Sequence, residues 1–183
     1  MKKFAAGVIL TLVCLIGGAY AYFAGGFAPV ATASSPMPFE KNLAKIALNA
    51  KLQKEMPRNV PIEANEANFI AGAHEYLINC AVCHGVPGKE KTAIARGEFP
   101  APPELFHGKG VSDDPPGETF WKVNNGIRLS GMPSFHDVLT ETQVWQVSLL
   151  LANADKPLPP EVLQIVRGVQ QTPAIPAPST QKP

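Results

Sequence analysis

Two cysteines and a histidine stand together in the stretch YLINCAVCHGVPG, residues 76–88, as Cys80, Cys83 and His84. Cysteines at this spacing occur in zinc sites, in redox-active dithiols, in disulfides and at points of haem attachment. Each of these uses needs different support from the rest of the chain. What the chain folds into therefore depends on which use the remaining sequence can support.

Two of these interpretations lack the residues that they need. A structural zinc site takes four ligands, usually from two such pairs, but the third cysteine, Cys14, lies in a long apolar segment near the N-terminus. A thioredoxin-like dithiol lies at a helix N-terminus between strands, whereas residues 66–81 predict a helix that ends at the cysteines. A disulfide between Cys80 and Cys83 stays open as an alternative, although it gives His84 no role.

Covalent attachment of haem uses all three residues. Cys80 and Cys83 are almost one helical turn apart, so both thiols can reach the vinyl groups along one edge of a porphyrin. His84 then follows beneath the ring, where an imidazole can bind iron, and Gly85 allows a tight turn after it. The C-x-x-C-H motif is a specific signal. The sequence therefore predicts one haem c, bound through Cys80 and Cys83, with His84 on the iron.

The second iron ligand must come from another part of the chain. Met132 stands 48 residues after His84, in a loop where Gly131 and Pro133 would bend and stiffen the backbone. This places a thioether where it can face the ring, although a methionine can also fill a gap in a core. The other candidates are Met37, Met56, His74, His107 and His136. We therefore predict Met132 as the sixth ligand. We expect His136 at the surface and His107 exposed or hydrogen-bonded, whereas His74 lies on the same helix as His84 and cannot easily cross the haem plane.

The N-terminal segment is long and apolar. Residues 4–27 contain no charge, and none occurs between Lys3 and Glu40. At about 1.5 Å per residue, 24 residues are enough to span a hydrocarbon core of about 30 Å. Since the two lysines favour the cytoplasmic side, we expect residues 1–3 in the cytoplasm and a single-pass anchor in the inner membrane, with the rest of the chain on the periplasmic, extracytoplasmic side. A cleaved signal peptide is the alternative, because AYA at 19–21 and ATA at 31–33 resemble cleavage sites.

The rest of the chain divides by composition. Residues 28–59 are predicted to form a tether with a short helix, residues 60–155 a compact domain, and residues 156–183 a Pro-rich tail with a helical turn at 161–168. Within the domain we expect a helix at 66–81, a long loop at 86–116 that wraps around something, and two further helices. We find no convincing strand, so the fold class is predicted to be all-α.

The two later helices have recognisable ends. The first is expected to be capped by Asp114, with Pro115 in its first turn, and to end at Asn125 and Gly126. The second is expected to open with a capping box formed by Thr140 and Gln143. These boundaries predict a loop that contains Met132 between the two helices.

These segments resemble the class I (mitochondrial-type) cytochrome c family over about 90 residues. The motifs that carry the resemblance are GAHEYLINCAVCHG, FWKVNNGI, GMPSF and LTETQVWQVSLLLANA. The resemblance implies a small helical cytochrome c domain around one haem, with His84 and Met132 as axial ligands and the ELFHGKG loop over the haem. It also implies that the first helix crosses the last at Gly72 and Tyr76, with Trp145 and Leu149 as their partners. The anchor, the arm at 39–55 and the tail have no counterpart in the resemblance.

The expected function follows from a closed iron site. A formal net charge of +1 argues against a nucleic-acid binder, and His/Met ligation leaves no open position on the iron. A thioether ligand raises the reduction potential, and an apolar wall acts in the same direction. The expected wall residues are Ile94, Leu105, Phe106, Phe120, Trp121 and Ile127.

We therefore expect an electron-transfer protein, not an enzyme, that carries one electron at a time between membrane respiratory or dehydrogenase complexes. Its partners would be redox proteins, with no small-molecule substrate and no nucleic acid. One alternative is a fixed haem-bearing subunit of a membrane oxidoreductase complex. Another is a haem enzyme or gas sensor with a labile sixth ligand.

Overall fold

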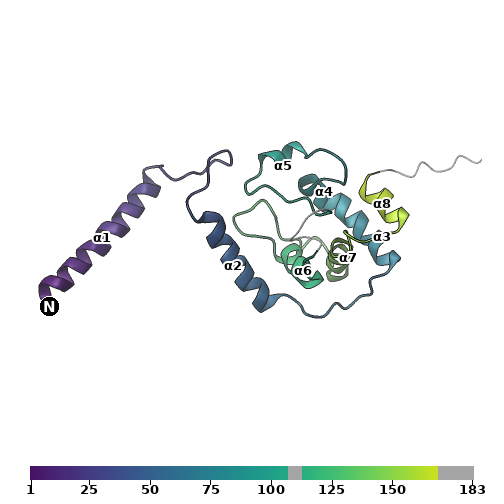
Figure 1. Ribbon diagram of the computed structural model, residues 1–183, viewed down its shortest axis with the longest axis horizontal. Helices are drawn as coiled ribbons and strands as arrows, with labels where there is room; N and C mark the ends of the chain where they lie inside the picture. Colours follow the sequence, from purple (N-terminus) through teal and green to yellow (C-terminus); the bar gives the residue numbers. More distant parts are fainter. Residues whose placement is uncertain (107–112, 169–183) are drawn as a thin grey trace, which may run out of the picture. The chain divides into compact units, whose positions relative to one another are not determined.

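The computed structural model describes residues 1–106 and 113–168 (Figure 1). All regular structure in these residues is helical, which confirms the predicted all-α fold. The helices in chain order are α1 Lys2–Ala24, α2 Glu40–Glu55, α3 Glu66–Glu75, the π-helix η1 Tyr76–Cys80, α4 Ala81–His84, α5 Ala93–Gly97, α6 Pro116–Asn125, α7 Glu141–Leu151 and α8 Pro160–Val166. His107, most of the ELFHGKG loop and the TPAIPAPSTQKP tail lie outside the described residues. The chain divides into two compact units, Met1–Asn49 and Ala50–Pro183.

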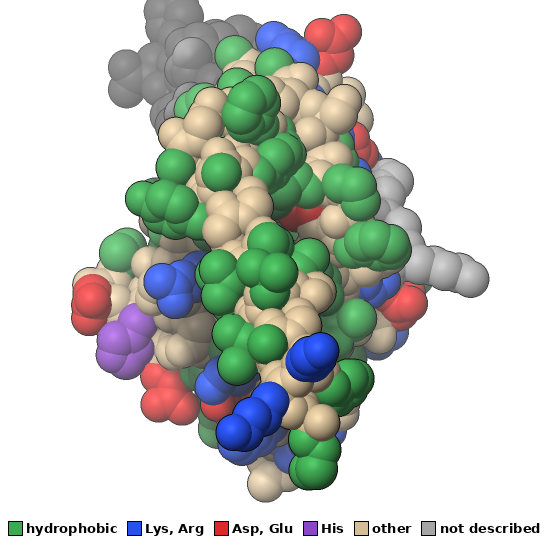
Figure 2. Space-filling model, turned by 90° about the vertical axis from the view of Figure 1, so that its left-hand side faces the viewer, with side chains coloured by type: hydrophobic (Ala, Val, Ile, Leu, Met, Phe, Trp, Pro, Cys, Tyr) green, Lys and Arg blue, Asp and Glu red, His purple; other side chains and the backbone are tan. Residues whose placement is uncertain are grey.

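The first unit contains α1 and the beginning of α2. Helix α1 is 23 residues long and none of its residues is buried. Apolar side chains cover its length and lysines stand at its N-terminal end (Figure 2). By length and composition α1 can cross a membrane, a property that signal sequences share.

The core of the second unit forms where α3 packs against α7. A Cβ atom at Gly72 would lie 2.4 Å from the carbonyl oxygen of Gln146, so only glycine allows this approach. The predicted helix contact at Gly72 is confirmed, but its partners are displaced in register. The nearest backbone is that of Gln146 and Val147, and the side chain of Val147 joins the same core cluster as Tyr76.

Helix α8 adds to this core. Leu158, Val162 and Val166 are buried, and α8 packs against α3 and η1. The predicted helical turn near 161–168 is therefore present. Because its apolar residues complete the core, the segment after residue 155 contributes to the folding of the domain.

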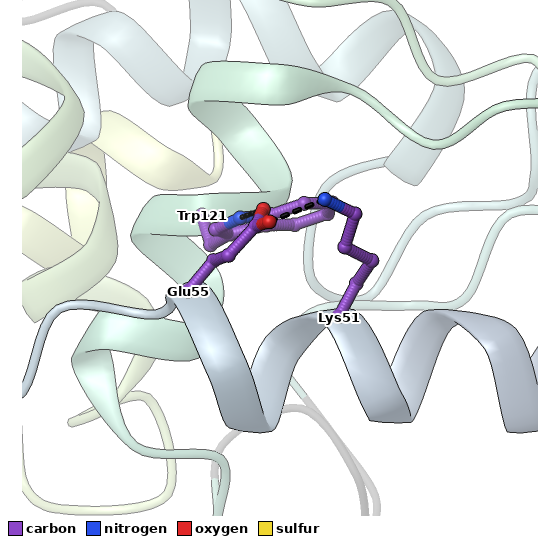
Figure 3. A network of polar contacts seen from close by, with 3 residues as sticks. All are labelled: Lys51, Glu55 and Trp121. Carbon is purple, nitrogen blue, oxygen red and sulfur yellow. Dashed lines mark hydrogen bonds and ion pairs between the residues drawn. The ribbon is translucent and has the colours of Figure 1, made fainter.

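The end of α2 packs against α6. Leu52 and Met56 are buried, and a Cβ atom at Gly117 would lie 1.9 Å from the carbonyl oxygen of Pro57. The indole Nε1 of Trp121 donates a hydrogen bond of 3.3 Å to Glu55, which also pairs with Lys51 (Figure 3). The last turns of α2 are thus held by both apolar and polar contacts.

The ends of α6 and α7 partly follow the prediction. Helix α6 begins one residue later than predicted, because Pro115 is its N-cap and Pro116 its first residue, while Asp114 instead binds Lys122 at 2.8 Å. Gly126, with φ of +68°, ends α6 as predicted, and Thr140 forms the expected capping box in front of α7. The loop that contains Met132 is therefore bounded by two well-defined helix ends.

Candidate functional site

The cysteine motif lies on a helix that changes its pitch. Helix α3 begins at Asn65, whose side chain accepts a hydrogen bond from the amide of Asn68, and passes into the π-turn η1 and then α4. The helical path therefore continues to His84, three residues beyond the predicted end, and stops at Gly85 with φ of +74°. π-turns are rare and frequent at functional sites. Cys80 is buried and Cys83 partly exposed, and both are free thiols.

The orientation of His84 is set by a backbone carbonyl. Its Nδ1 lies 2.8 Å from the oxygen of Pro103, and since a carbonyl can only accept, Nδ1 must carry the proton. Burial lowers the pKa of His84, against smaller opposing effects of the Pro103 carbonyl and Glu98. The ring is therefore held as a neutral imidazole with the lone pair on Nε2, which is the form that binds a metal.

Tyr76 supports the chain directly after His84. Its hydroxyl donates a hydrogen bond of 2.7 Å to the carbonyl of Gly85, and its ring meets Phe106 edge-on at 4.9 Å. Burial raises the pKa of Tyr76, so the hydroxyl stays protonated and remains a donor. The sequence analysis expected Tyr76 at the helix crossing. It did not predict the hydrogen bond to Gly85, because the spacing of residues in the sequence does not show which group the Tyr76 hydroxyl contacts.

Glu98 is a site residue that the sequence analysis missed. The thiol of Cys83 donates to Glu98 Oε1 at 3.0 Å, and a Cβ atom at Gly131 would lie 2.7 Å from Glu98 Oε2. The same carboxylate thus reaches the cysteine motif and the residue before Met132. A single acidic residue in a long irregular segment carries no pattern that could have identified it.

Both thiols are neutral at pH 7. Burial, followed by the hydrogen bond and charge of Glu98, raises the pKa of Cys83 to about 11. Burial is also the largest cause of the raised pKa of Cys80, about 12. The two cysteines therefore lack the lowered pKa of a redox-active dithiol.

Met132 lies in a loop whose backbone is fixed on both sides. Its amide donates to Ser130 Oγ at 3.2 Å, and its carbonyl accepts from the amide of Ile127 at 3.1 Å. Its side chain packs against the apolar cluster formed by Val123, Leu139 and Val144. The thioether is thus positioned by the loop and by the core beside it.

The other candidate ligands are placed differently. His136 is exposed, with Nδ1 3.3 Å from the side-chain oxygen of Asn124, and His74 is an exposed residue on α3. Met56 is buried near the end of α2, and Met37 belongs to the first unit. Among the candidates in the described residues, Met132 is the one next in sequence to Gly131, the residue that lies against Glu98.

The residues expected in the apolar wall differ in their burial. Phe106 is buried with Leu105 packed beside it, and Phe120 stacks on Trp145 with ring centroids 4.2 Å apart. Ile94 is 52% exposed on the short helix α5, and its place beside a haem stays a prediction. No residue of the described part of the chain accepts a hydrogen bond from the buried Nε1 of Trp145.

The donor set fits a covalently attached haem. It consists of two neutral thiols, a neutral imidazole whose Nε2 is left for iron, and a thioether in a loop linked to the cysteine motif through Glu98. These are the groups that two thioether bonds and two axial positions require.

Comparison with known families agrees with this chemistry. Residues 67–149 match the family model described as cytochrome C oxidase, cbb3-type, subunit III. These residues form a c-type cytochrome domain. Such a domain implies covalently bound haem c and electron transfer. The matched region contains the cysteine motif, Glu98 and Met132.

Other comparisons add little. No curated protein gives a significant match. A chain of the reducing HAO-like protein complex of Kuenenia stuttgartiensis is 21% identical with a TM-score of 0.46, over 57% of this chain and 53% of that chain. The match thus spans about half of that structure, and a likeness at this level says nothing about function.

Proposed function

We propose that the cytochrome domain, predicted as residues 60–155, carries one haem c joined to Cys80 and Cys83, with His84 and Met132 as the axial ligands. This is the ligation of class I, mitochondrial-type cytochromes. The proposal rests chiefly on the hydrogen bond from His84 Nδ1 to Pro103, because it leaves a neutral Nε2 for the iron. The haem supplies one-electron chemistry when bound, and the chain holds it, shields it from water and closes its iron to other ligands.

The proposed role is that of a one-electron carrier at a membrane. Helix α1 would anchor the chain in the inner membrane in a single pass, with the cytochrome domain on the periplasmic, extracytoplasmic side. Electrons would pass between this domain and membrane respiratory or dehydrogenase complexes. Because His84 and Met132 would occupy both axial positions, the iron would have no open site for a substrate, and the proposed role is electron transfer and not enzyme catalysis.

A fixed subunit of a membrane oxidoreductase complex is the second candidate. The description of the matched family, a subunit of a cbb3-type oxidase, favours it. Purification from native membranes in mild detergent separates the two roles. A shuttle elutes alone, whereas a subunit elutes with a larger complex in fixed proportion.

The ligation is tested by near-infrared spectroscopy of the oxidised protein. Met ligation predicts a sulfur-to-iron charge-transfer band, which Met132→Ala should abolish and the matched variant His136→Ala should leave intact. A band unchanged in Met132→Ala would show that another group is the sixth ligand. Ready binding of carbon monoxide by the reduced wild-type protein would instead favour the haem enzyme or gas sensor.

A further inference from the structure

The first half of α2 exposes three large apolar side chains along one face. Phe39 is 75% exposed, Leu43 65% and Ile46 66%. Since residues three and four apart share one side of a helix, they form a continuous line, which we call the outer stripe. Single exposed apolar residues are ordinary, whereas a continuous line of them marks a contact surface.

The start of α2 holds Phe39 in place. Its backbone has φ of +66°, a conformation that bulky residues rarely adopt. Its carbonyl accepts the amide of Leu43 at 2.9 Å, and the side chain of Glu40 accepts the amide of Met37 at 2.8 Å. The backbone of Phe39 therefore forms part of the first turn at the start of the helix.

The opposite side of α2 carries a buried apolar residue. Leu52 follows Leu43 by nine residues, which places it about 180° around the helix axis. It is only 2% exposed, and Met56 is buried one turn later. A helix with an apolar residue buried on one side and an apolar line exposed on the other has a second surface to cover.

The connection to α1 indicates what covers it. Helix α1 ends at Ala24, and the 14 residues from 25 to 38 carry no charge. Fully extended, they span at most about 50 Å, so α2 cannot move far from a membrane that α1 spans. Helices with an apolar face and basic residues lie in the membrane interface.

The net charge of α2 also favours a contact with a lipid surface. The helix contains Lys41, Lys45, Lys51 and Lys54 against Glu40 and Glu55, four positive charges minus two negative, a formal +2. Basic residues beside a membrane span are attracted to anionic headgroups.

We propose that the outer stripe of α2 lies in the headgroup region of the membrane that α1 spans, as an interfacial contact with a lipid surface containing anionic lipids. The proposal rests on the membrane anchor of the proposed function.

Site-directed spin labelling of the full, haem-loaded chain tests this. In a Cys14→Ser background, a nitroxide is attached at Leu43→Cys, at Asn49→Cys about 120° around the helix, or at Ile16→Cys within α1. The proteins are placed in vesicles of phosphatidylcholine and phosphatidylglycerol. Collision with oxygen and with a water-soluble nickel chelate then measures the depth of each label.

We expect the label at residue 43 about 5–10 Å below the headgroups, with the label at residue 49 in water. Labels at 43 and 49 that are equally accessible to nickel, while the label at 16 lies in lipid, would overturn the proposal and leave the anchor standing. A label at 16 in water would overturn both. A label at 43 that is in water in lipid vesicles but immobilised in native membranes would assign the stripe to a protein partner and also overturn the proposal.

Discussion

The Cys83 thiol donates to Glu98 at 3.0 Å, and the same carboxylate lies against Gly131, next to Met132. Glu98 therefore joins the segment that holds one face of the proposed haem to the loop that holds the other. It also contributes to the low acidity of one thiol before haem is attached, because burial, and after it Glu98, raises the pKa of Cys83.

The first prediction concerns this pKa. In haem-free protein, Glu98→Gln should lower the pKa of Cys83 from about 11, since both the hydrogen bond to the carboxylate and its charge favour the neutral thiol. Alkylation of Cys83 at a fixed mildly alkaline pH should then become faster, because only the thiolate reacts. Peptide mass spectrometry after timed iodoacetamide treatment measures the rate of alkylation at each cysteine. Cys80 is the internal control, because its pKa is raised by burial, Glu75 and Cys83. Equal acceleration at both cysteines would indicate that the variant has loosened the fold.

The second prediction concerns covalent attachment. Cys80→Ala and Cys83→Ala should each leave one thioether, so the pyridine haemochrome band should move to longer wavelength as one vinyl group stays conjugated. The double variant should release its haem into acidic acetone. Cys14→Ala is the matched control and should leave the spectrum unchanged, because Cys14 is an exposed residue of α1. Retention of haem by the double variant would contradict attachment through this motif.

The sequence predicted what depends on local pattern. The Thr140 cap, the glycine end of α6 and the close approach at Gly72 follow from short-range chemistry, and the structure contains all of them. The ligand assignments themselves remain predictions. The register of α7 was wrong by one to two residues, because its apolar residues occur almost all round the helix and do not identify the face toward α3.

Features that depend on long-range contacts were not predictable. Glu98 meets Cys83 at a separation of 15 residues, and Trp121 meets Glu55 at a separation of 66 residues. Pro103 contacts His84 through its backbone carbonyl oxygen. Because every residue has such an oxygen, the residue type at position 103 could not have predicted the contact.

The third prediction concerns the contact between α3 and α7. Gly72→Ala should destabilise the haem-loaded domain by about 1–3 kcal/mol, because its Cβ atom meets the backbone of Gln146, which cannot move aside as a side chain can. Gly97→Ala is the matched control, since nothing lies within 4 Å of its Cβ position. It should be neutral or up to about 1 kcal/mol stabilising. Urea unfolding followed by circular dichroism measures both, and equal stability of the two variants would contradict a close helix crossing.

The fourth prediction separates the two sides of α2. Leu52→Ala should destabilise the domain by about 2–5 kcal/mol, because it opens a cavity at a fully buried position. Leu43→Ala should stay within about 0.5 kcal/mol of the wild-type protein in detergent, since the side chain is exposed. Trp121→Phe should fall between them, because it removes one hydrogen bond, to Glu55, and keeps an aromatic ring. Urea unfolding in the same detergent ranks the three variants. A Leu52→Ala variant as stable as Leu43→Ala would mean that α2 contributes nothing to the folding of the cytochrome domain, whereas the expected ranking makes the last turns of α2 part of it.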